Sequence, residues 1–518
     1  MALIRPFKVW QGPSQTRNTE EVIVAVQSSI LALDVGTSST RAILYDTSGN
    51  ALSDLTAQLG YQLTTSHEGE ASVDADFLLE LVARTIDEIL QRAGERAESI
   101  IAVATSTFWH TLLPLDAGGH PLLSLMTWED TRPQQNCVEL RQKLDEAALH
   151  RRTGARLHTS YWPAKISWLV SAYPEIARQT ARYVSFGEYL HERLLGRSVC
   201  SLSMASGTGL LNIHTRAWDA DLLAALPLAR AQLPAIGDLS DPLEGLRPEF
   251  ARRWPVLANV PWFPAIGDGA AANVGSHCLT SSTWAVTMGT SSALRVVVPP
   301  EEVELEPGLW LYFVDARRAL LGGALSEGGN MVAWLAKTLQ LPNLTELDGQ
   351  LEQMEPDAHG LTVLPMLSGE RSPGWHTNAS MTITGLTIHS TPAEIARAAL
   401  EAVVFQVSRV YDQLAHALSA NTTSPRLIAS GAALLKSSLL RQVLADTLNR
   451  PLELLESSEA SARGAALLAL EALGIIPDLS QLTPKTSALV QPDPARHAVY
   501  QKARARQRTL YELLFARN

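Results

Sequence analysis

A single carboxylate near the middle of the chain has a setting that suits a catalytic base. Asp268 stands between Gly267 and Gly269, at the start of a run of glycines and alanines. A carboxylate in such a position can accept a proton from an attacking hydroxyl group. The alternative is an ordinary turn residue, because aspartate beside glycine is common in turns.

Two loops of small hydroxyl residues, one in each half of the chain, favour the catalytic interpretation. Each loop follows an apolar run and leads into another. The loops are Gly36, Thr37 and Ser38 in the first half and Gly289, Thr290 and Ser291 in the second. Backbone N–H groups and hydroxyls in such loops can bind phosphate oxygens. One loop alone would be an ordinary hairpin, but two in matching contexts predict a duplicated domain with phosphate-binding loops and Asp268 between the copies.

The two copies differ at one position that bears on metal binding. Asp34 lies two residues before Gly36, whereas Thr287 holds the equivalent place before Gly289. A carboxylate beside a phosphate loop repels the ligand unless a cation lies between them. Because Mg²⁺ gives up its water reluctantly, Asp34 is predicted to hold Mg²⁺ through water.

Length and composition narrow the class of protein. A chain of 518 residues is too long for one core, so two large domains are expected. The net charge of −11 argues against nucleic-acid and anionic-membrane partners. Three widely spaced cysteines argue against a disulfide framework and favour a reducing, cytoplasmic location. Neither a Walker A motif nor a complete G-x-G-x-x-G motif is present.

Helices and strands can be predicted around these residues. Apolar spacing and turn signals predict helices at 76–97 and 494–516 and buried strands at 99–105, 320–325 and 426–429. A further helix is predicted to begin at Thr391, with Pro392 in its first turn and Glu394 completing a capping box. The loops at 106–110 and 127–132 follow strands, where ligand groups usually lie in α/β folds. No architecture is predicted for 133–260.

Several motifs together resemble the FGGY carbohydrate kinases of the actin/Hsp70/sugar-kinase superfamily. They lie, in the family's order, at 34–40, 267–275, 288–291, 368–373, 430–437 and 458–466. The resemblance implies an α/β fold with two RNase H-like domains and ATP and sugar in the cleft between them. It also implies that Asp268 is the catalytic base, that the two loops hold the phosphates of Mg·ATP, and that Gly431 and Ala432 pass against the nucleoside.

The resemblance also divides the chain and suggests an assembly. Residues 1–28 are an extension of unknown role, 29–276 the sugar-side domain, and 277–480 the nucleotide-side domain. Residues 481–518 form a C-terminal tail with the terminal helix. A homodimer is what the family suggests.

Within the family, the stretches at 127–132, 152–168 and 203–211 are most similar to the gluconokinases, although xylulokinases share parts of them. The expected reaction is ATP-dependent phosphorylation of a terminal hydroxyl, with D-gluconate as the favoured substrate. The alternatives are a xylulokinase or other ketose or polyol kinase, and a non-catalytic nucleotide-binding member of the superfamily.

The resemblance assigns the sugar side of the cleft to two loops. The expected substrate-binding residues are Trp109, His110, Trp128, Asp130, Arg132 and Asp268. Arg132, His110 and Lys165 are the candidates for binding a substrate carboxylate. Two of them have structural alternatives, because Arg132 could pair with Asp130 and Lys165 could be a buried structural lysine.

Two departures from the family pattern concern both ligands. Ala432 stands where the family usually has the second glycine of a pair, which puts a methyl group at a close backbone approach. Trp109 precedes His110 where the family usually has methionine, which narrows the sugar side and leaves the identity of the sugar open.

Overall fold

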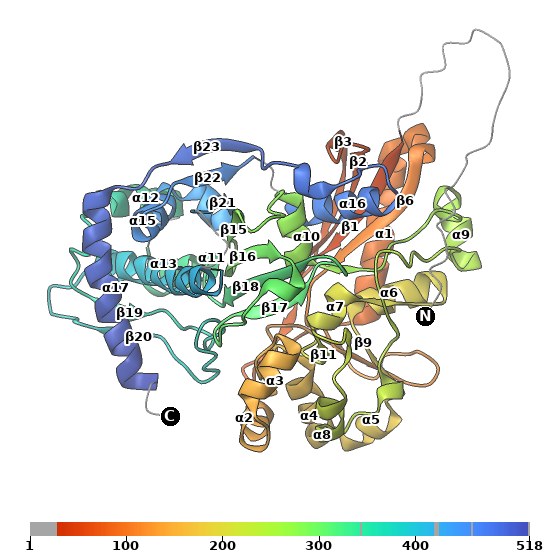
Figure 1. Cartoon of the computed structure of the whole chain (residues 1–518), viewed down its shortest axis with the longest axis horizontal. Helices are drawn as coiled ribbons and strands as arrows, with labels where there is room; N and C mark the ends of the chain where they lie inside the picture. The colour runs from red at the N-terminus through yellow and green to blue at the C-terminus, as the bar shows by residue number, and fades with distance from the viewer. Residues whose placement is uncertain (1–27, 342–343, 419–423, 457–458, 516–518) are drawn as a thin grey trace, which may run out of the picture.

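Two β-sheets, each with its own helices, organise the molecule (Figure 1). The computed structural model describes residues 28–341, 344–418, 424–456 and 459–515. The extension expected at 1–28 lies outside these residues, except for residue 28. Ser458, the first residue of the motif at 458–466, also lies outside them. No helix within the described ranges is long and apolar enough to cross a membrane.

The first sheet is built by the N-terminal half and has the order β14-β6-β1-β2-β3. Its strands are β1 (Ser29–Val35), β2 (Ser39–Asp46), β3 (Ala51–Gly60), β6 (Ile100–Thr107) and β14 (Ile266–Gly267). The first three strands form an antiparallel meander, and β6 and β14 run parallel to β1. β1 is buried on both faces, in agreement with its unbroken apolar sequence.

The second sheet repeats this arrangement. Its core strands are β18 (Ala319–Leu325), β16 (Ser292–Val298), β15 (Thr283–Met288), β21 (Arg426–Ser430) and β22 (Leu452–Leu455). β15, β16 and β18 form the meander, and β21 and β22 run parallel to β15. β17 (Trp310–Phe313) and β23 (Thr486–Val490) extend the sheet at its two edges. The predicted α/β fold with two related domains is confirmed.

Local signals account for the helices that flank the sheets. α1 (Ala75–Ala93) ends at Gly94, whose φ of 54° breaks the helix four residues before the predicted end. α13 (Pro392–Ala417) begins as predicted, with both hydrogen bonds of the capping box between Thr391 and Glu394 present. Fifteen of its residues are buried, because it packs across the second sheet.

The two sheets meet through a pair of equivalent helices, α10 (Asp268–Gly275) after β14 and α16 (Ala460–Ala472) after β22. A β-carbon on Gly464 would lie 1.7 Å from the carbonyl oxygen of Ala271, and one on Gly275 would lie 1.9 Å from that of Ala460. Only glycine allows the two backbones to approach this closely. Figure 1 shows this crossing between the two sheets.

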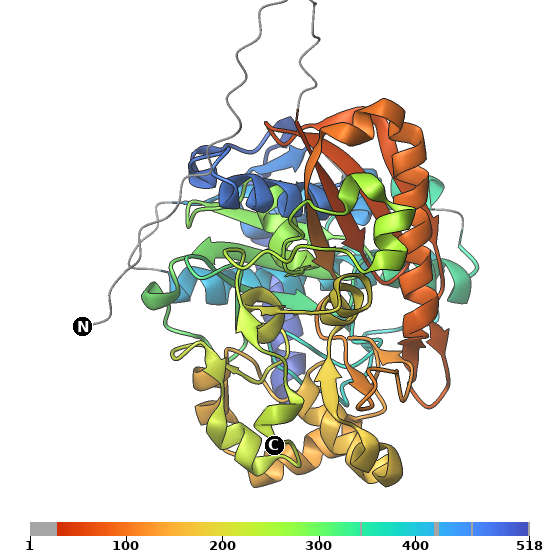
Figure 2. The ribbon, with the colours of Figure 1, turned by 90° about the vertical axis from the view of Figure 1, so that its right-hand side faces the viewer.

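The region 133–260, for which no architecture was predicted, forms short helices below the first sheet (Figure 2). They include α2 (Gln134–Lys143), α3 (Glu146–Thr153), α4 (Trp162–Ala172), α6 (Phe186–Leu195) and α7 (Leu202–Ser206). This layer contacts the second domain where the backbone N–H of Leu311 donates to the carbonyl of Gly154 over 2.9 Å.

The C-terminal segment is integrated into the second domain. β23 pairs with β22, and α17 (Pro494–Phe515) packs against α15 (Ser438–Leu448) and β19 (Thr362–Leu364). The buried Tyr500 hydroxyl accepts a 2.9 Å hydrogen bond from Arg397 of α13. The division after residue 480, expected as the start of a tail, therefore does not separate a structural unit, because the sheet and its helices continue across it.

Candidate active site

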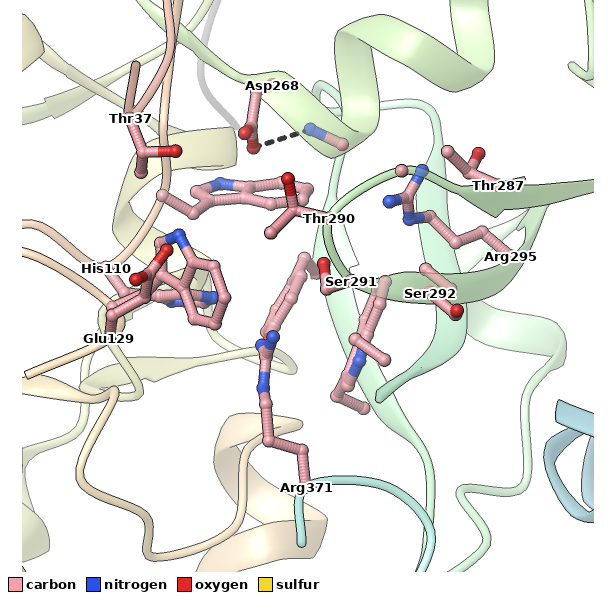
Figure 3. A pocket seen from close by; sticks show the side chains of 18 residues that line it. Thr37, His110, Glu129, Asp268, Thr287, Thr290, Ser291, Ser292, Arg295 and Arg371 are labelled. Atoms are coloured by element: carbon pink, nitrogen blue, oxygen red, sulfur yellow. Dashed lines mark hydrogen bonds between the residues drawn. The ribbon is translucent and has the colours of Figure 1, made fainter. Parts of the chain in front are cut away.

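A cavity of about 220 Å³ lies between the two domains, beside the loops that follow β1 and β15 (Figure 3). Asp268 lines it together with groups from both sheets. A second cavity of about 770 Å³ adjoins the first, and the two share Trp128, Glu129, Thr290 and Arg371 in their walls. The first cavity is called the inner cavity below, and the second the outer cleft.

The two hydroxyl loops have matching geometry. Each is a three-residue connection between antiparallel strands, Gly36 to Ser38 between β1 and β2 and Gly289 to Ser291 between β15 and β16. Thr37 of the first loop and all three residues of the second line the inner cavity, whereas Gly36 and Ser38 do not. The structure therefore brings the two loops to one cavity.

The second loop is fixed by the start of α11 (Gly329–Thr338). The N–H of Gly329 donates to the carbonyl of Gly289 over 2.6 Å, and that of Asn330 donates to the carbonyl of Thr290 over 3.1 Å. A β-carbon on Gly328 would lie 2.7 Å from the carbonyl carbon of Ser291. The loop conformation therefore depends on small residues at 328 and 329.

Asp268 opens α10 and presents its carboxylate to the inner cavity. Its Oδ1 accepts a 2.7 Å hydrogen bond from the N–H of Gly269 (Figure 3), and its carbonyl accepts one from Ser461 Oγ over 3.3 Å. Burial raises the pKa of Asp268, and the positive charge of Arg295 opposes this rise. A raised pKa makes the carboxylate a better proton acceptor, as a general base requires.

Trp109 packs directly against the backbone that carries Asp268. A β-carbon on Gly267 would lie 1.9 Å from Trp109 Cε2, and one on Gly269 would lie 2.6 Å from its Cζ3. The indole N–H donates to the carbonyl of Ser203 over 3.0 Å, which fixes the ring plane. Trp109 also lines the cavity, so it forms part of the wall and supports the base.

His110 lies beside Trp109 in the cavity wall, and its Nδ1 bonds the carbonyl of Gly207. Burial lowers its pKa well below the usual value, and the charge of Arg371 lowers it further. The imidazole is therefore neutral at physiological pH, which makes it a hydrogen-bonding group for a sugar hydroxyl and a poor partner for a carboxylate.

Asp34 ends β1 beside the first loop and is 5% exposed. It forms a 3.2 Å ion pair with Arg41. Burial raises its pKa to about 6, Arg41 opposes this rise, and the charge of Asp268 adds to it. Two buried carboxylates that are close enough for the charge of Asp268 to raise the pKa of Asp34 fit a divalent cation between them and a polyphosphate. Asp34 does not itself line the cavity, which fits a contact through water.

Two of the expected substrate-binding side chains, and the carboxylate candidate Lys165, have partners within the protein. Asp130 is fully buried, and Arg132 binds it through Nε and Nη2 at 3.0 and 2.6 Å. Neither residue lines the inner cavity, so the structure has the local ion pair that was the alternative for Arg132. Lys165 is also buried, and its Nζ donates to the carbonyls of His110 and Thr127 over 2.6 and 2.7 Å. Lys165 therefore joins the two substrate-side loops and lines neither cavity.

Two arginines that sequence reasoning did not assign line the inner cavity instead. Arg295 projects from β16 near Asp268, and Arg371 enters from the loop after β19 (Figure 3). A signal existed for Arg295, since a charge inside the apolar run 293–298 is costly unless it is used. Arg371 lies in the motif at 368–373, but its partners come from distant segments. Trp310 and Tyr312 of β17, stacked at 4.2 Å, complete the aromatic wall.

The residues expected beside the nucleoside lie at the neighbouring strand end. Gly431 follows β21 with a φ of 92°, and its β-carbon would lie 2.4 Å from the carbonyl oxygen of Met288. Ala432 is the first residue of α14 (Ala432–Lys436), where a methyl group is compatible with the backbone. Neither residue lines the inner cavity.

Both domains of this chain match a known protein family. The model described as "FGGY family of carbohydrate kinases, N-terminal domain" matches residues 29–275, and the corresponding C-terminal domain model matches 284–473. Gluconokinase of Bacillus licheniformis is 28% identical over 460 residues, covering 87% of this chain and 88% of that protein. Xylulose kinase of Escherichia coli (strain K12) is 29% identical over 491 residues, covering 93% and 99%.

A solved structure agrees with these matches. The crystal structure of gluconate kinase from Lactobacillus acidophilus has a TM-score of 0.86 at 28% identity, covering 95% of this chain and 99% of that one. Its similarity extends over both sheets and the crossing between them. The chain therefore belongs to the FGGY family of carbohydrate kinases, enzymes that use ATP to phosphorylate an alcohol group of a sugar.

Proposed function

We propose that this enzyme phosphorylates the terminal hydroxyl of a small open-chain sugar acid, with D-gluconate as the favoured substrate. The observation that carries the proposal is that one cavity is lined by Asp268, by Thr37 of the first hydroxyl loop, by all three residues of the second loop, and by two arginine side chains. The base and the loops serve phosphoryl transfer, and the arginines suit a substrate with a negative charge. The similarity to proteins named gluconokinase supports this choice.

In the proposed reaction, Asp268 accepts the proton of the substrate hydroxyl. The hydroxyl oxygen forms a bond to the γ-phosphorus of ATP while the bond from that phosphorus to the β–γ bridging oxygen breaks, releasing ADP. Thr37, Thr290 and Ser291 hold the phosphate oxygens with hydroxyl and backbone groups. Arg295, beside Asp268, offsets the negative charge that accumulates near the transferred group.

Asp34 is proposed to hold Mg²⁺ through water at the edge of the first loop. When bound, the cation supplies positive charge to the polyphosphate. Gly431 and Ala432 are proposed to lie against the nucleoside. Closure of the domains around both substrates should exclude water, because hydrolysis of ATP is the competing reaction.

The proposal is tested by ADP release with Mg·ATP and a panel of gluconate, xylulose, ribulose, glycerol and erythritol, with a control lacking sugar. Stimulation by gluconate alone is expected. Stimulation by a neutral ketose or polyol alone would contradict the choice of a sugar acid. Xylulose remains the second candidate because a protein named xylulose kinase is equally similar.

A non-catalytic nucleotide-binding role has less support. It requires neither a base nor the aromatic wall formed by Trp109, Trp310 and Tyr312, and the cavity has both. ATP turnover independent of every sugar would favour that role. The cytoplasmic location and the homodimer remain predictions.

A further inference from the structure

One cation of the active site, Arg371, forms no ion pair within the described part of the chain. The side chain of Arg371 is 8% exposed and borders both cavities. Within the described ranges of the chain, its guanidinium has no ion pair or hydrogen bond, and its Nε is fully enclosed without a partner. Burying a charge without an ion-pair partner costs roughly several kcal/mol of stability. A buried, unpaired cation in a cavity wall therefore points to a bound anionic group as its partner.

The orientation of Arg371 leaves its donors available. Its guanidinium lies over the indole of Trp128, 5.2 Å from the ring centroid. This contact uses the face of the guanidinium, and its two Nη groups have no hydrogen-bond partner among the described residues. A planar edge with parallel donors matches the two oxygens of a carboxylate.

Arg371 stands where the inner cavity opens into the outer cleft. It shares this neck with Trp128, Glu129 and Thr290. Its charge acts on the sugar-side wall. Burial is the main cause of the lowered pKa of His110 and of His158, and the positive charge of Arg371 is the second cause for both. Glu129 borders the neck as well but forms no ion pair with Arg371 in the part of the chain that the structure describes.

Arg295 has a different position. It lies next to the base, with its Cζ 3.5 Å from the β-carbon position of Gly269, and the charge of Asp268 raises its pKa against the effect of burial. Arg295 therefore lies beside the carboxylate of the base. Arg371 forms no ion pair among the described residues, although its charge lowers the pKa of both Glu129 and Asp268. Figure 3 shows Arg371 on the side of the inner cavity opposite Asp268, with Arg295 beside the second loop.

We infer that Arg371 is the specificity-determining residue that binds the carboxylate of the sugar acid, so that the terminal hydroxyl at the other end of the substrate reaches Asp268. This inference rests on the proposed function, since it assumes an acidic substrate. Arg371 belongs to the second domain, whereas Asp268 and Trp128 belong to the first. A sugar acid thus connects the two domains, and a neutral sugar of the same length does not.

The test compares three ligands by isothermal titration calorimetry: gluconate, glucitol and ATP. Glucitol has a hydroxymethyl group in place of the carboxylate. Arg371→Met should bind gluconate about 10²-fold more weakly than the wild type, the scale of a lost charge-assisted bidentate bond. Its affinities for glucitol and ATP should not change. The gluconate affinity of Arg371→Lys should lie between those of Arg371→Met and the wild type, because lysine keeps the charge but loses the paired donors.

A matched control comes from another arginine stacked on a tryptophan. Arg253 lies over Trp254 at 5.4 Å and borders neither cavity. Arg253→Met should leave all three affinities unchanged. Thermal unfolding of Arg371→Met should occur at or above the wild-type temperature, because an unpaired buried charge is removed.

Two results would overturn the inference. One is equal gluconate affinity in Arg371→Met and the wild type. The other is weaker ATP binding in the variant with gluconate binding retained, which would assign Arg371 to a phosphate. Wild-type turnover separates these failures from failure of the proposed function. If the enzyme phosphorylates gluconate regardless of residue 371, the proposed function stands and the role of Arg371 is wrong. If the wild type neither binds nor phosphorylates gluconate, both are wrong.

Discussion

The indole of Trp109 lies directly against the α-carbon of Gly267, so that a β-carbon there would stand 1.9 Å from Cε2 and 2.0 Å from Nε1. Gly267 immediately precedes the proposed base. The backbone at Asp268 is therefore held by an aromatic ring from a loop that also forms the sugar-side wall.

This contact predicts a coupled pair of substitutions. Gly267→Ala should push the ring and the base apart and lower kcat by about 10²-fold, the effect of a displacement of about 1 Å at a reacting group. Trp109→Met should restore much of this loss by making room for the methyl group. A double-mutant cycle on kcat measures the coupling. Independent effects of the two substitutions would show that the ring does not position Asp268.

Asp268→Asn should separate binding from chemistry. The amide keeps the shape of the side chain but cannot accept the proton, so kcat should fall by about 10²-fold or more. Calorimetry should show ATP binding close to that of the wild type. Unchanged turnover would remove Asp268 from the mechanism.

The two raised carboxyl pKa values predict an acidic limit to activity. Asp34, with a pKa of about 6, must be ionised to hold a cation, so kcat/KM should fall as the pH decreases through about 6. The raised pKa of Asp268 acts in the same direction, because a protonated base cannot accept a proton.

The charge of Arg41 sets the position of this limit. Since Arg41 lowers the pKa of Asp34, Arg41→Gln should raise it and move the acidic limb to higher pH. Arg41→Lys retains a positive charge and should leave the limb close to its original place. The pH dependence of ADP release measures the effect of both substitutions. If the acidic limb of Arg41→Gln lay at the same pH as that of the wild type, Asp34 would not be the group that sets this limb.

The Asp130–Arg132 pair predicts a loss of stability more than a loss of specificity. Arg132→Met leaves the fully buried Asp130 without its charge partner, which should cost about 3 kcal/mol of unfolding free energy. Asp130→Asn in the same chain should recover part of it. Urea unfolding gives the free energies. A larger effect on gluconate affinity than that of Arg371→Met would restore Arg132 as the carboxylate contact.

The crossing of α10 and α16 predicts a strict requirement for glycine. Gly464→Ala places a methyl group 1.7 Å from the carbonyl oxygen of Ala271 and should lower the free energy of unfolding by about 1–3 kcal/mol or more. Gly349→Ala is the control, because Gly349 lies exposed in α12 (Leu344–Glu352) with nothing within 4 Å of its β-carbon position. That substitution should raise stability by about 0.5–1 kcal/mol.

Features set by neighbouring residues could be predicted from the sequence. The capping box of Thr391 and Glu394 needs only four consecutive positions, and the hydroxyl loops are three-residue hairpins between apolar strands. Repetition of the loop made the duplicated fold predictable, because equivalent segments of a duplicated chain have equivalent surroundings.

Features that depend on distant contacts could not be predicted. Arg132 and Arg371 both follow an acidic residue closely in the chain, and only the fold shows that Arg132 turns back to Asp130 while Arg371 reaches Trp128. The short helices of 133–260 do carry local signals, such as the Ser185–Glu188 capping box of α6, but their arrangement depends on burial among segments distant in the chain. The integration of α17 into the second domain likewise depends on pairing that sequence periodicity does not encode.

The close crossing of α10 and α16 at Gly275 and Gly464 places the proposed base at the contact between the two domains. Asp268 is the first residue of α10 and is tied to α16 by Ser461, so a rotation of one domain against the other about this contact displaces the carboxylate very little. Arg371 lies on the opposite side of the inner cavity from Asp268 (Figure 3), so the same rotation would displace it more. A rotation of this kind would leave the reacting end of the substrate nearly in place, while the end proposed to contact Arg371 would move with the second domain.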